Sequence, residues 1–170
     1  MPTLDPHLKA EFTDALVQTG RKLRTRFNAE VVRHGLTYPR ARALAVLARR
    51  QPLRQSELAV ELELEGPTVV RLLDGMERIG LVKRQGVAGD RRAKAVALTA
   101  HGRRQAETVA AISSRIRDVI LARSAGADVA VALGVLRLIG DAIDLDFRDA
   151  DPGEAGRLGE TPPAGSDGDA

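Results

Sequence analysis

The sequence predicts a mainly α-helical fold with one small β-hairpin, and three observations support this prediction. First, Gly66–His101 reads as an amphipathic helix, a strand, a glycine-rich basic loop and a second strand. Second, a short amphipathic helix at Gln55–Leu62 precedes it at the close spacing of a helix-turn-helix. Third, Gly66–Arg104 holds nine Lys and Arg residues against three acids. Together they indicate a DNA-binding winged helix-turn-helix rather than two ordinary amphipathic helices in a small α/β domain.

The first half of the chain predicts two helices and a bridge. Apolar residues at four- and seven-residue steps predict a helix over Pro6–Arg33, longer than a typical globular helix and suited to packing on a partner. Gly35 ends it, a second helix covers Pro39–Arg50, and Leu53 is a candidate one-residue bridge to the hairpin strands. The apolar face of the first helix comprises Leu8, Phe12, Leu16, Leu23, Phe27 and Val31.

The recognition helix of the predicted motif begins with Pro67 and stops at Gly80. Its polar face carries Thr68, Arg71, Asp74 and Arg78. Its apolar stripe comprises Val69, Leu72, Leu73, Met76 and Ile79.

The hairpin strands are expected at Leu81–Arg84 and Lys94–Leu98. Strand alternation turns Val82, Val96 and Leu98 inward and Lys83 and Lys94 outward.

Two more helices follow the hairpin. Thr99 caps a helix that runs to about Ala122, with an apolar stripe that includes Val109 and Val119. Asp128 opens a last helix that is apolar on nearly every side as far as Ile139, which predicts that it is buried. A small winged domain cannot cover both this helix and the long first one. A homodimer with interlocked terminal helices is therefore expected, and a monomeric helix bundle is the alternative.

Composition narrows the class of protein. The 170 residues suit one domain, or one domain with appendages. With 44% apolar but only 2% aromatic residues, the core must be aliphatic. There is no Cys, which excludes disulfides and thiol sites. No apolar run approaches the ~18 residues of a membrane helix. The N-terminus does not read as a signal peptide, so we expect a cytoplasmic protein without a membrane partner.

Charge is distributed unevenly along the chain. Residues 149–170 hold six acids and one base, which predicts a disordered acidic tail, either inert or weakening non-specific DNA binding. The remainder carries a net charge of +8, and Arg supplies 22 of the 26 basic residues. Arg suits DNA phosphates and narrow minor grooves, although a GC-rich genome produces the same bias.

Three segments carry a family resemblance. GDRRAKAVALTAHG resembles the wing motif of MarR-type regulators, in which Asp90 and Arg92 form the Asp-x-Arg pair and Leu98 and Thr99 follow. LLDGMERIGLVKR resembles the end of that family's recognition helix and its first wing strand, and LTYPRARALAVLAR resembles its second helix. The resemblance covers about Leu8 to Phe147 and departs at Gly66–Pro67, where a Ser or Thr cap is common.

The resemblance implies a winged helix-turn-helix domain over 1–148. Its dimerisation helices would lie at about 6–34 and 99–147 and its DNA-binding lobe at about 53–98, with the tail over 149–170. We expect a transcriptional regulator, a repressor, that binds a pseudo-palindromic double-stranded operator as a homodimer and is released by a small ligand. The alternatives are a constitutive DNA-binding factor without an effector and a winged-helix protein-interaction module.

Candidate DNA contacts follow from the motif. Arg71 is a candidate guanine reader, or else pairs with Asp74, and Lys83 and Arg84 are candidate phosphate contacts or simply solvated. By resemblance Asp90 holds Arg92 for the minor groove, and the alternative is a solvated ion pair worth little. The expected DNA-binding residues are Pro67, Thr68, Val69, Arg71, Arg78, Lys83, Arg84, Asp90, Arg91, Arg92 and Lys94.

The resemblance also implies a cleft for a small anionic aromatic effector. The residues placed near it are Arg21, Arg24, Tyr38, Arg40 and Arg42, each of which is alternatively a surface or DNA-facing charge. The three histidines lack carboxylate partners at metal-ligand spacing, and no catalytic array is recognisable. We therefore expect no metal, no cofactor and no enzyme activity.

Overall fold

The computed structural model describes residues 4–87 and 90–149, with side-chain surroundings for residues 4–86 and 94–145. The chain forms two compact units, Met1–Leu121 and Ala122–Ala170. Helices dominate, and one three-stranded antiparallel sheet accompanies them, so the predicted fold class is confirmed. The predicted acidic tail lies outside the described residues from 150 onward.

The two N-terminal helices lie where the apolar spacing places them. Helix α1 spans Pro6–Arg33 and ends before Gly35, whose φ of 73° is a left-handed conformation that favours glycine. Helix α2 spans Tyr38–Arg49, one residue earlier than predicted. Pro39 stands in its first turn, where its missing N–H costs no hydrogen bond.

Helices α3 (Gln55–Leu62) and α4 (Gly66–Arg78) form the helix-turn-helix. The Glu57 carboxylate closes the start of α3 by accepting the backbone N–H of Arg54 at 2.7 Å. Glu63 ends α3 in the left-handed region at φ 56°, which turns the chain toward α4 within three residues. Gly80, at φ 71°, makes the turn after α4.

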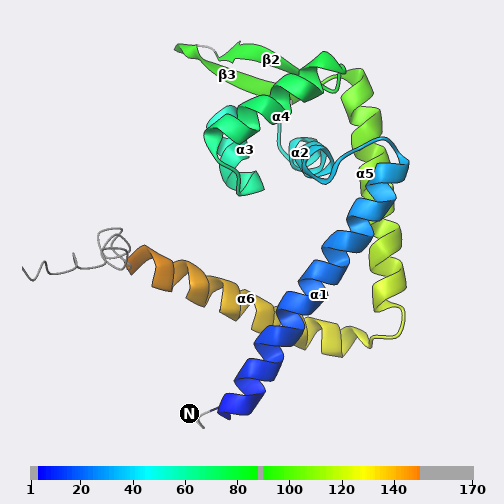
Figure 1. Cartoon of the computed structure of the whole chain (residues 1–170), viewed down its shortest axis with the longest axis vertical. Helices are drawn as coiled ribbons and strands as arrows, with labels where there is room; N and C mark the ends of the chain where they lie inside the picture. Colours follow the sequence, from blue (N-terminus) through cyan, green and yellow to red (C-terminus); the bar gives the residue numbers. More distant parts are fainter. Residues whose placement is uncertain (1–3, 88–89, 150–170) are drawn as a thin grey trace, which may run out of the picture. The chain divides into compact units, whose positions relative to one another are not determined.

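The sheet has the order β1-β3-β2. Strand β1 is Leu53–Arg54, and the predicted bridge is confirmed by the pairing of Leu53 with Val96. Strands β2 (Val82–Val87) and β3 (Asp90–Leu98) form the wing hairpin. They are longer than predicted, because backbone pairing continues along the basic residues toward the tip. In Figure 1, α4 lies beneath this hairpin.

The inward and outward alternation of the hairpin is confirmed. Val82, Val96 and Leu98 are buried, whereas Lys83 and Lys94 are exposed.

Helix α5 (Ala100–Leu121) leaves the base of the wing through a tight junction. The Thr99 hydroxyl donates to the Gly80 carbonyl at 2.6 Å and accepts the N–H of Gly102 at 2.9 Å, which confirms Thr99 as a cap. A Cβ on Gly102 would lie 1.9 Å from the Leu81 carbonyl oxygen. Only glycine permits this close approach of two backbones.

The core of the first unit joins α2, α3, α4, the sheet base and α5. The predicted stripes of α4 and α5 enter it in part: Ile79 and Val119 are exposed, because each follows the last turn that faces the core. The fully buried larger side chains are Val31, Leu44, Leu47, Leu53, Leu58, Val69, Leu73, Met76, Leu81, Val82, Val96 and Leu98.

One buried carboxylate ties α1 to α5. Glu30 is 3% exposed and pairs with Arg115 of α5 at 2.8 Å. Arg26 and Arg33 of its own helix also approach it, at 3.0 and 3.5 Å. Hydrogen bonds to charged groups stabilise more than neutral ones, so this cluster offsets the cost of burying the carboxylate.

Helix α6 (Gly126–Asp149) belongs to the second unit and begins two residues before the predicted start. Within the single chain its apolar residues up to Ile139 are mostly exposed, so its burial stays a prediction that depends on the expected homodimer. Among the described residues no single helix is long and apolar enough to cross a membrane.

Gly102→Ala tests the junction. The new Cβ cannot avoid the Leu81 carbonyl, and overpacking of this kind costs about 1–3 kcal/mol of unfolding free energy. Chemical denaturation provides the measurement. Gly20→Ala is the control, since nothing lies within 4 Å of a Cβ there, and it should leave stability unchanged or raise it by up to about 1 kcal/mol. Equal stabilities of the two variants would contradict the close approach.

Candidate nucleic-acid interface

Helix α4 presents its predicted polar face to solvent. Thr68, Arg71, Asp74 and Arg78 are all exposed, as is Pro67 in the first turn. Val69 is buried with 1% of its surface exposed, so it cannot reach a base edge, and its prediction as a DNA contact is wrong. Its neighbour Val70 is the exposed apolar residue in this turn. The sequence stripe already pointed to Val69 as core.

Arg84 clamps the first wing strand to α4. Its Nη2 lies 2.6 Å from Asp74 Oδ1, and its Nη1 lies 2.6 Å from Glu77 Oε2. The Arg84 backbone N–H also donates to Glu77 Oε1 at 3.1 Å. Only 15% of the Arg84 side chain is exposed. The guanidinium thus bridges two carboxylates, one through each terminal nitrogen, and these charge-assisted bonds hold strand β2 against helix α4.

This clamp changes two of the predicted assignments. Arg84 is not a free phosphate contact, because its two terminal nitrogens already donate hydrogen bonds to Glu77 and Asp74. The partner of Asp74 is Arg84 rather than Arg71. Sequence spacing gave no sign of this pairing, which joins residues ten apart across a turn.

Two further cations of the wing, Lys83 and Lys94, lie among the residues whose side chains the structure describes. Lys83 and Lys94 point outward from adjacent strands, and Lys94 shares a surface hollow with Gln55 and Val70. The side chains of Asp90, Arg91 and Arg92 fall outside the described residues, so their predicted roles at the wing tip stay predictions. Exposed cations thus stand on both α4 and the hairpin, as a phosphate-binding face requires.

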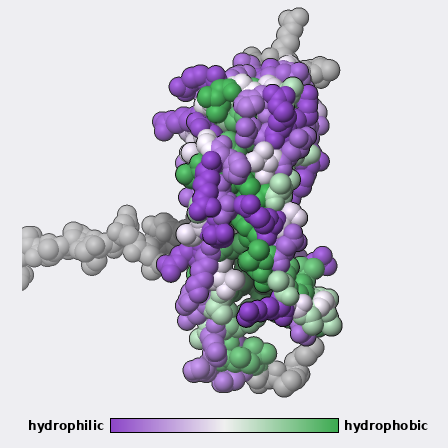
Figure 2. Space-filling view, turned by 90° about the vertical axis from the view of Figure 1, so that its right-hand side faces the viewer, coloured by the Kyte–Doolittle hydropathy of each residue, from purple (hydrophilic) through white to green (hydrophobic). Residues whose placement is uncertain are grey.

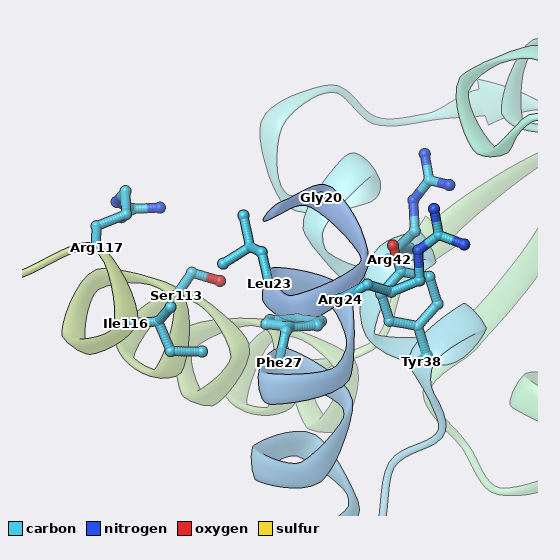
Figure 3. A pocket seen from close by; sticks show the side chains of 9 residues that line it. All are labelled: Gly20, Leu23, Arg24, Phe27, Tyr38, Arg42, Ser113, Ile116 and Arg117. Atoms are coloured by element: carbon cyan, nitrogen blue, oxygen red, sulfur yellow. The ribbon is translucent and has the colours of Figure 1, made fainter. Parts of the chain in front are cut away.

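A second site lies among α1, α2 and α5. It is a cavity of about 450 Å³ lined by apolar side chains and three arginines. Phe27 and Tyr38 meet edge to face there, with ring centroids 5.9 Å apart. Figure 3 shows the lining residues, with Arg24 and Arg42 on one side of the view and Arg117 on the other. The lining comprises Gly20, Leu23, Arg24, Phe27, Tyr38, Arg42, Ser113, Ile116 and Arg117.

The cavity brings together three of the five residues predicted for a ligand. Arg24, Tyr38 and Arg42 line it, whereas Arg21 lies on another face of α1. The Arg40 guanidinium instead points toward α4, where it would lie 3.5 Å from a Cβ at Gly75. Ser113 and Arg117 were missed, because they come from α5, far away in the sequence.

Arg42 has partners beyond the cavity. Its Nη2 donates to the carbonyl of Glu61 and its Nη1 to that of Leu62, both at 3.1 Å. Across the described part of the chain, no cluster of three or more His, Cys, Asp or Glu side chains could hold a metal ion.

Comparison with known proteins places the chain among transcriptional regulators. Residues 34–93 match the MarR family. The structure of transcriptional regulator PA3341 is 36% identical with a TM-score of 0.72, covering 78% of this chain and 98% of that one. AbsC, a MarR family regulator from Streptomyces coelicolor, is 22% identical with a TM-score of 0.72, covering 85% and 99%. The MepR–DNA complex from Staphylococcus aureus is 21% identical with a TM-score of 0.70, covering 78% and 97%.

The clamp predicts a specific dependence of stability on pH. The backbone N–H and the side chain of Arg84 donate to Glu77 and hold its pKa below the ordinary 4.5. The folded state therefore favours the ionised carboxyl, so this contribution is complete above pH 4.5 and is lost as the pH falls through the lowered pKa. Glu77→Gln should lose less stability than the wild type upon acidification below this value, as measured by thermal unfolding. Arg84→Ala should flatten the profile similarly, and parallel profiles for all three proteins would refute the clamp.

Proposed function

This chain belongs to the MarR family of transcriptional regulators, and on that premise we propose that it binds a pseudo-palindromic DNA operator as a homodimer. The proposal makes it a repressor that an anionic aromatic ligand releases, and a regulator rather than an enzyme. Such a protein works where chromosomal DNA is accessible, in the cytoplasm.

The amphipathic arrangement of helix α4 is the main support for the proposed DNA binding. One face is locked into the core through Val69, Leu73 and Met76, while the opposite face offers Thr68 and Arg71 to solvent. A helix that enters the major groove reads bases with its first turns, where these two side chains stand. Lys83 and Lys94 on the adjoining hairpin supply charges for the phosphates. A protein-interaction module would not need this arrangement.

Exposed apolar helices support the homodimer. Leu8, Phe12 and Leu16 are exposed along α1, and so are Leu133 and Leu136 on α6. Figure 2 shows apolar side chains, coloured green, open to the surface between purple polar ones. Large exposed apolar patches mark interaction surfaces, and a second copy of the chain offers a matching surface under two-fold symmetry.

The cavity among α1, α2 and α5 supports control by a ligand. Phe27, Tyr38 and Ile116 provide apolar and aromatic walls, and Arg24 and Arg117 provide cations. This combination of apolar walls with a few polar groups is typical of small-molecule sites. It suits a planar aromatic carboxylate. A ligand shifts DNA binding only through different affinities for the two states, and the effect is reciprocal.

Arg71→Ala and Lys83→Ala separate base reading from phosphate binding. Arg71→Ala should relax discrimination at one base position by about 1–3 kcal/mol. Lys83→Ala should weaken all sequences about equally and lower the salt slope by roughly one. Fluorescence anisotropy on the chain's own promoter and on random duplexes across a salt series provides the measurement. If Arg71→Ala weakened both duplexes alike, Arg71 would not be a base reader.

Truncation tests the homodimer. Sedimentation at micromolar concentration should give two chains per particle, and the DNA footprint should span half-sites about one helical turn apart. Removing residues 125–170 deletes α6 and should cause aggregation or unfolding, because in the proposed dimer the terminal helices of the two chains cover one another. Removing residues 150–170 alone retains α6 and serves as the control. A folded, monodisperse monomer after the longer deletion is incompatible with interlocked helices.

A further inference from the structure

Arg42 contacts both the cavity and the C-terminal end of helix α3. Its side chain lines the cavity among α1, α2 and α5, where Tyr38, one turn earlier on α2, is also a wall. Its guanidinium donates to the carbonyls of Glu61 and Leu62, the last two residues of α3. Figure 3 shows Arg42 extending from α2 beside the cavity. The side chain therefore connects the cavity with the first helix of the helix-turn-helix.

The end of α3 depends on this contact. The last four carbonyls of a helix have no partner within the helix, and α3 has only eight residues. Immediately after them Glu63 adopts a left-handed conformation at φ 56°, which is unfavourable for a residue with a side chain. The chain then reaches α4 at Gly66. Arg42 thus holds the turn that sets the direction of the recognition helix.

An anion in the cavity would compete for the same guanidinium. Nη1 and Nη2 of Arg42 now bond neutral carbonyl oxygens. Hydrogen bonds from a guanidinium to a carboxylate are charge-assisted and bidentate, which makes them stronger than bonds to a carbonyl. Arg24 and Arg117, the other cations of the cavity, add attraction for a negative ligand. A carboxylate there would draw Arg42 away from the end of α3.

We infer that Arg42 transmits occupancy of the cavity to the recognition helix by exchanging the α3 carbonyls for a ligand carboxylate. This inference rests on the proposed effector-responsive function and names the residue that carries it. In the free protein Arg42 fixes the turn through Glu63, and α4 is held for DNA. With an aromatic carboxylate bound, the end of α3 loses two hydrogen bonds and DNA affinity falls.

The coupling between ligand and DNA provides the test, with 4-hydroxybenzoate as the probe. Calorimetry measures its affinity for the full chain with and without a duplex of the chain's own promoter. The ratio of the two affinities should reach about fivefold or more in the wild type. Arg42→Lys keeps the positive charge but cannot bridge two carbonyls, so its ratio should fall close to one. Arg117→Lys is the matched control: the probe should bind more weakly while the ratio persists.

Amide hydrogen exchange tests the ligand-free half of the inference. The N–H groups of Glu63 and Leu64 donate to the carbonyls of Val60 and Ala59 at the end of α3. Arg42→Lys should speed their exchange, since the turn loses its anchor, whereas Arg117→Lys should not. Unchanged exchange in Arg42→Lys overturns the inference.

The outcomes also separate this inference from the proposed function. A wild-type ratio of one, or no binding of the probe, refutes the effector-responsive function and the inference with it. A wild-type ratio that Arg42→Lys fully retains overturns the role of Arg42 alone and leaves the effector-responsive function standing.

Discussion

The close contact between the first turn of α5 and the backbone of Leu81 fixes how the DNA-binding elements attach to the rest of the first unit. Leu81 is the last residue between α4 and β2, and the Thr99 hydroxyl donates to the carbonyls of Gly80 and Leu81 from the end of β3. Because Gly102 has no side chain, α5 approaches until backbone meets backbone. The segment between the recognition helix and the wing is therefore held directly against the start of α5.

The charges on the face formed by α4 and the wing depend on ion pairing as well as on the excess of basic residues. Asp74 and Glu77 lie within a strongly basic segment, yet both serve to immobilise Arg84. Arg84, Asp74 and Glu77 neutralise one another in part and hold β2 against α4, which positions the neighbouring cations. Arg71 and Lys83 both stay exposed. Acidic residues on a DNA-facing surface thus act as internal supports, and a net charge calculated from sequence overstates the cations that face a phosphate.

The sequence predicted the order of the elements and the bounds of the helices to within about two residues, because apolar periodicity marks most of the helices, whereas the hairpin strands extend further toward the tip than predicted. It could not predict contacts between elements. Arg84 reads as a solvated wing cation until Asp74 and Glu77 are brought beside it in space. Ser113 and Arg117 join Phe27 in the cavity only through the packing of α5 on α1. Val69 shows a different failure, since its position in the first turn suggested DNA although the stripe placed it in the core.

The Glu30 cluster has a consequence for how the chain tolerates sequence drift. One carboxylate receives three guanidinium groups, and two of them come from its own helix. Loss of Arg26 or Arg33 leaves the acid paired with two other guanidinium groups, so a substitution at either position should be tolerated. Loss of Glu30 leaves three like charges crowded together. Arg115 is the member that joins two helices. Another residue can supply its positive charge, but only a side chain as long as that of Arg115 reaches Glu30 from α5. Substitutions at Glu30 and Arg115 should therefore be less well tolerated than substitutions at Arg26 or Arg33.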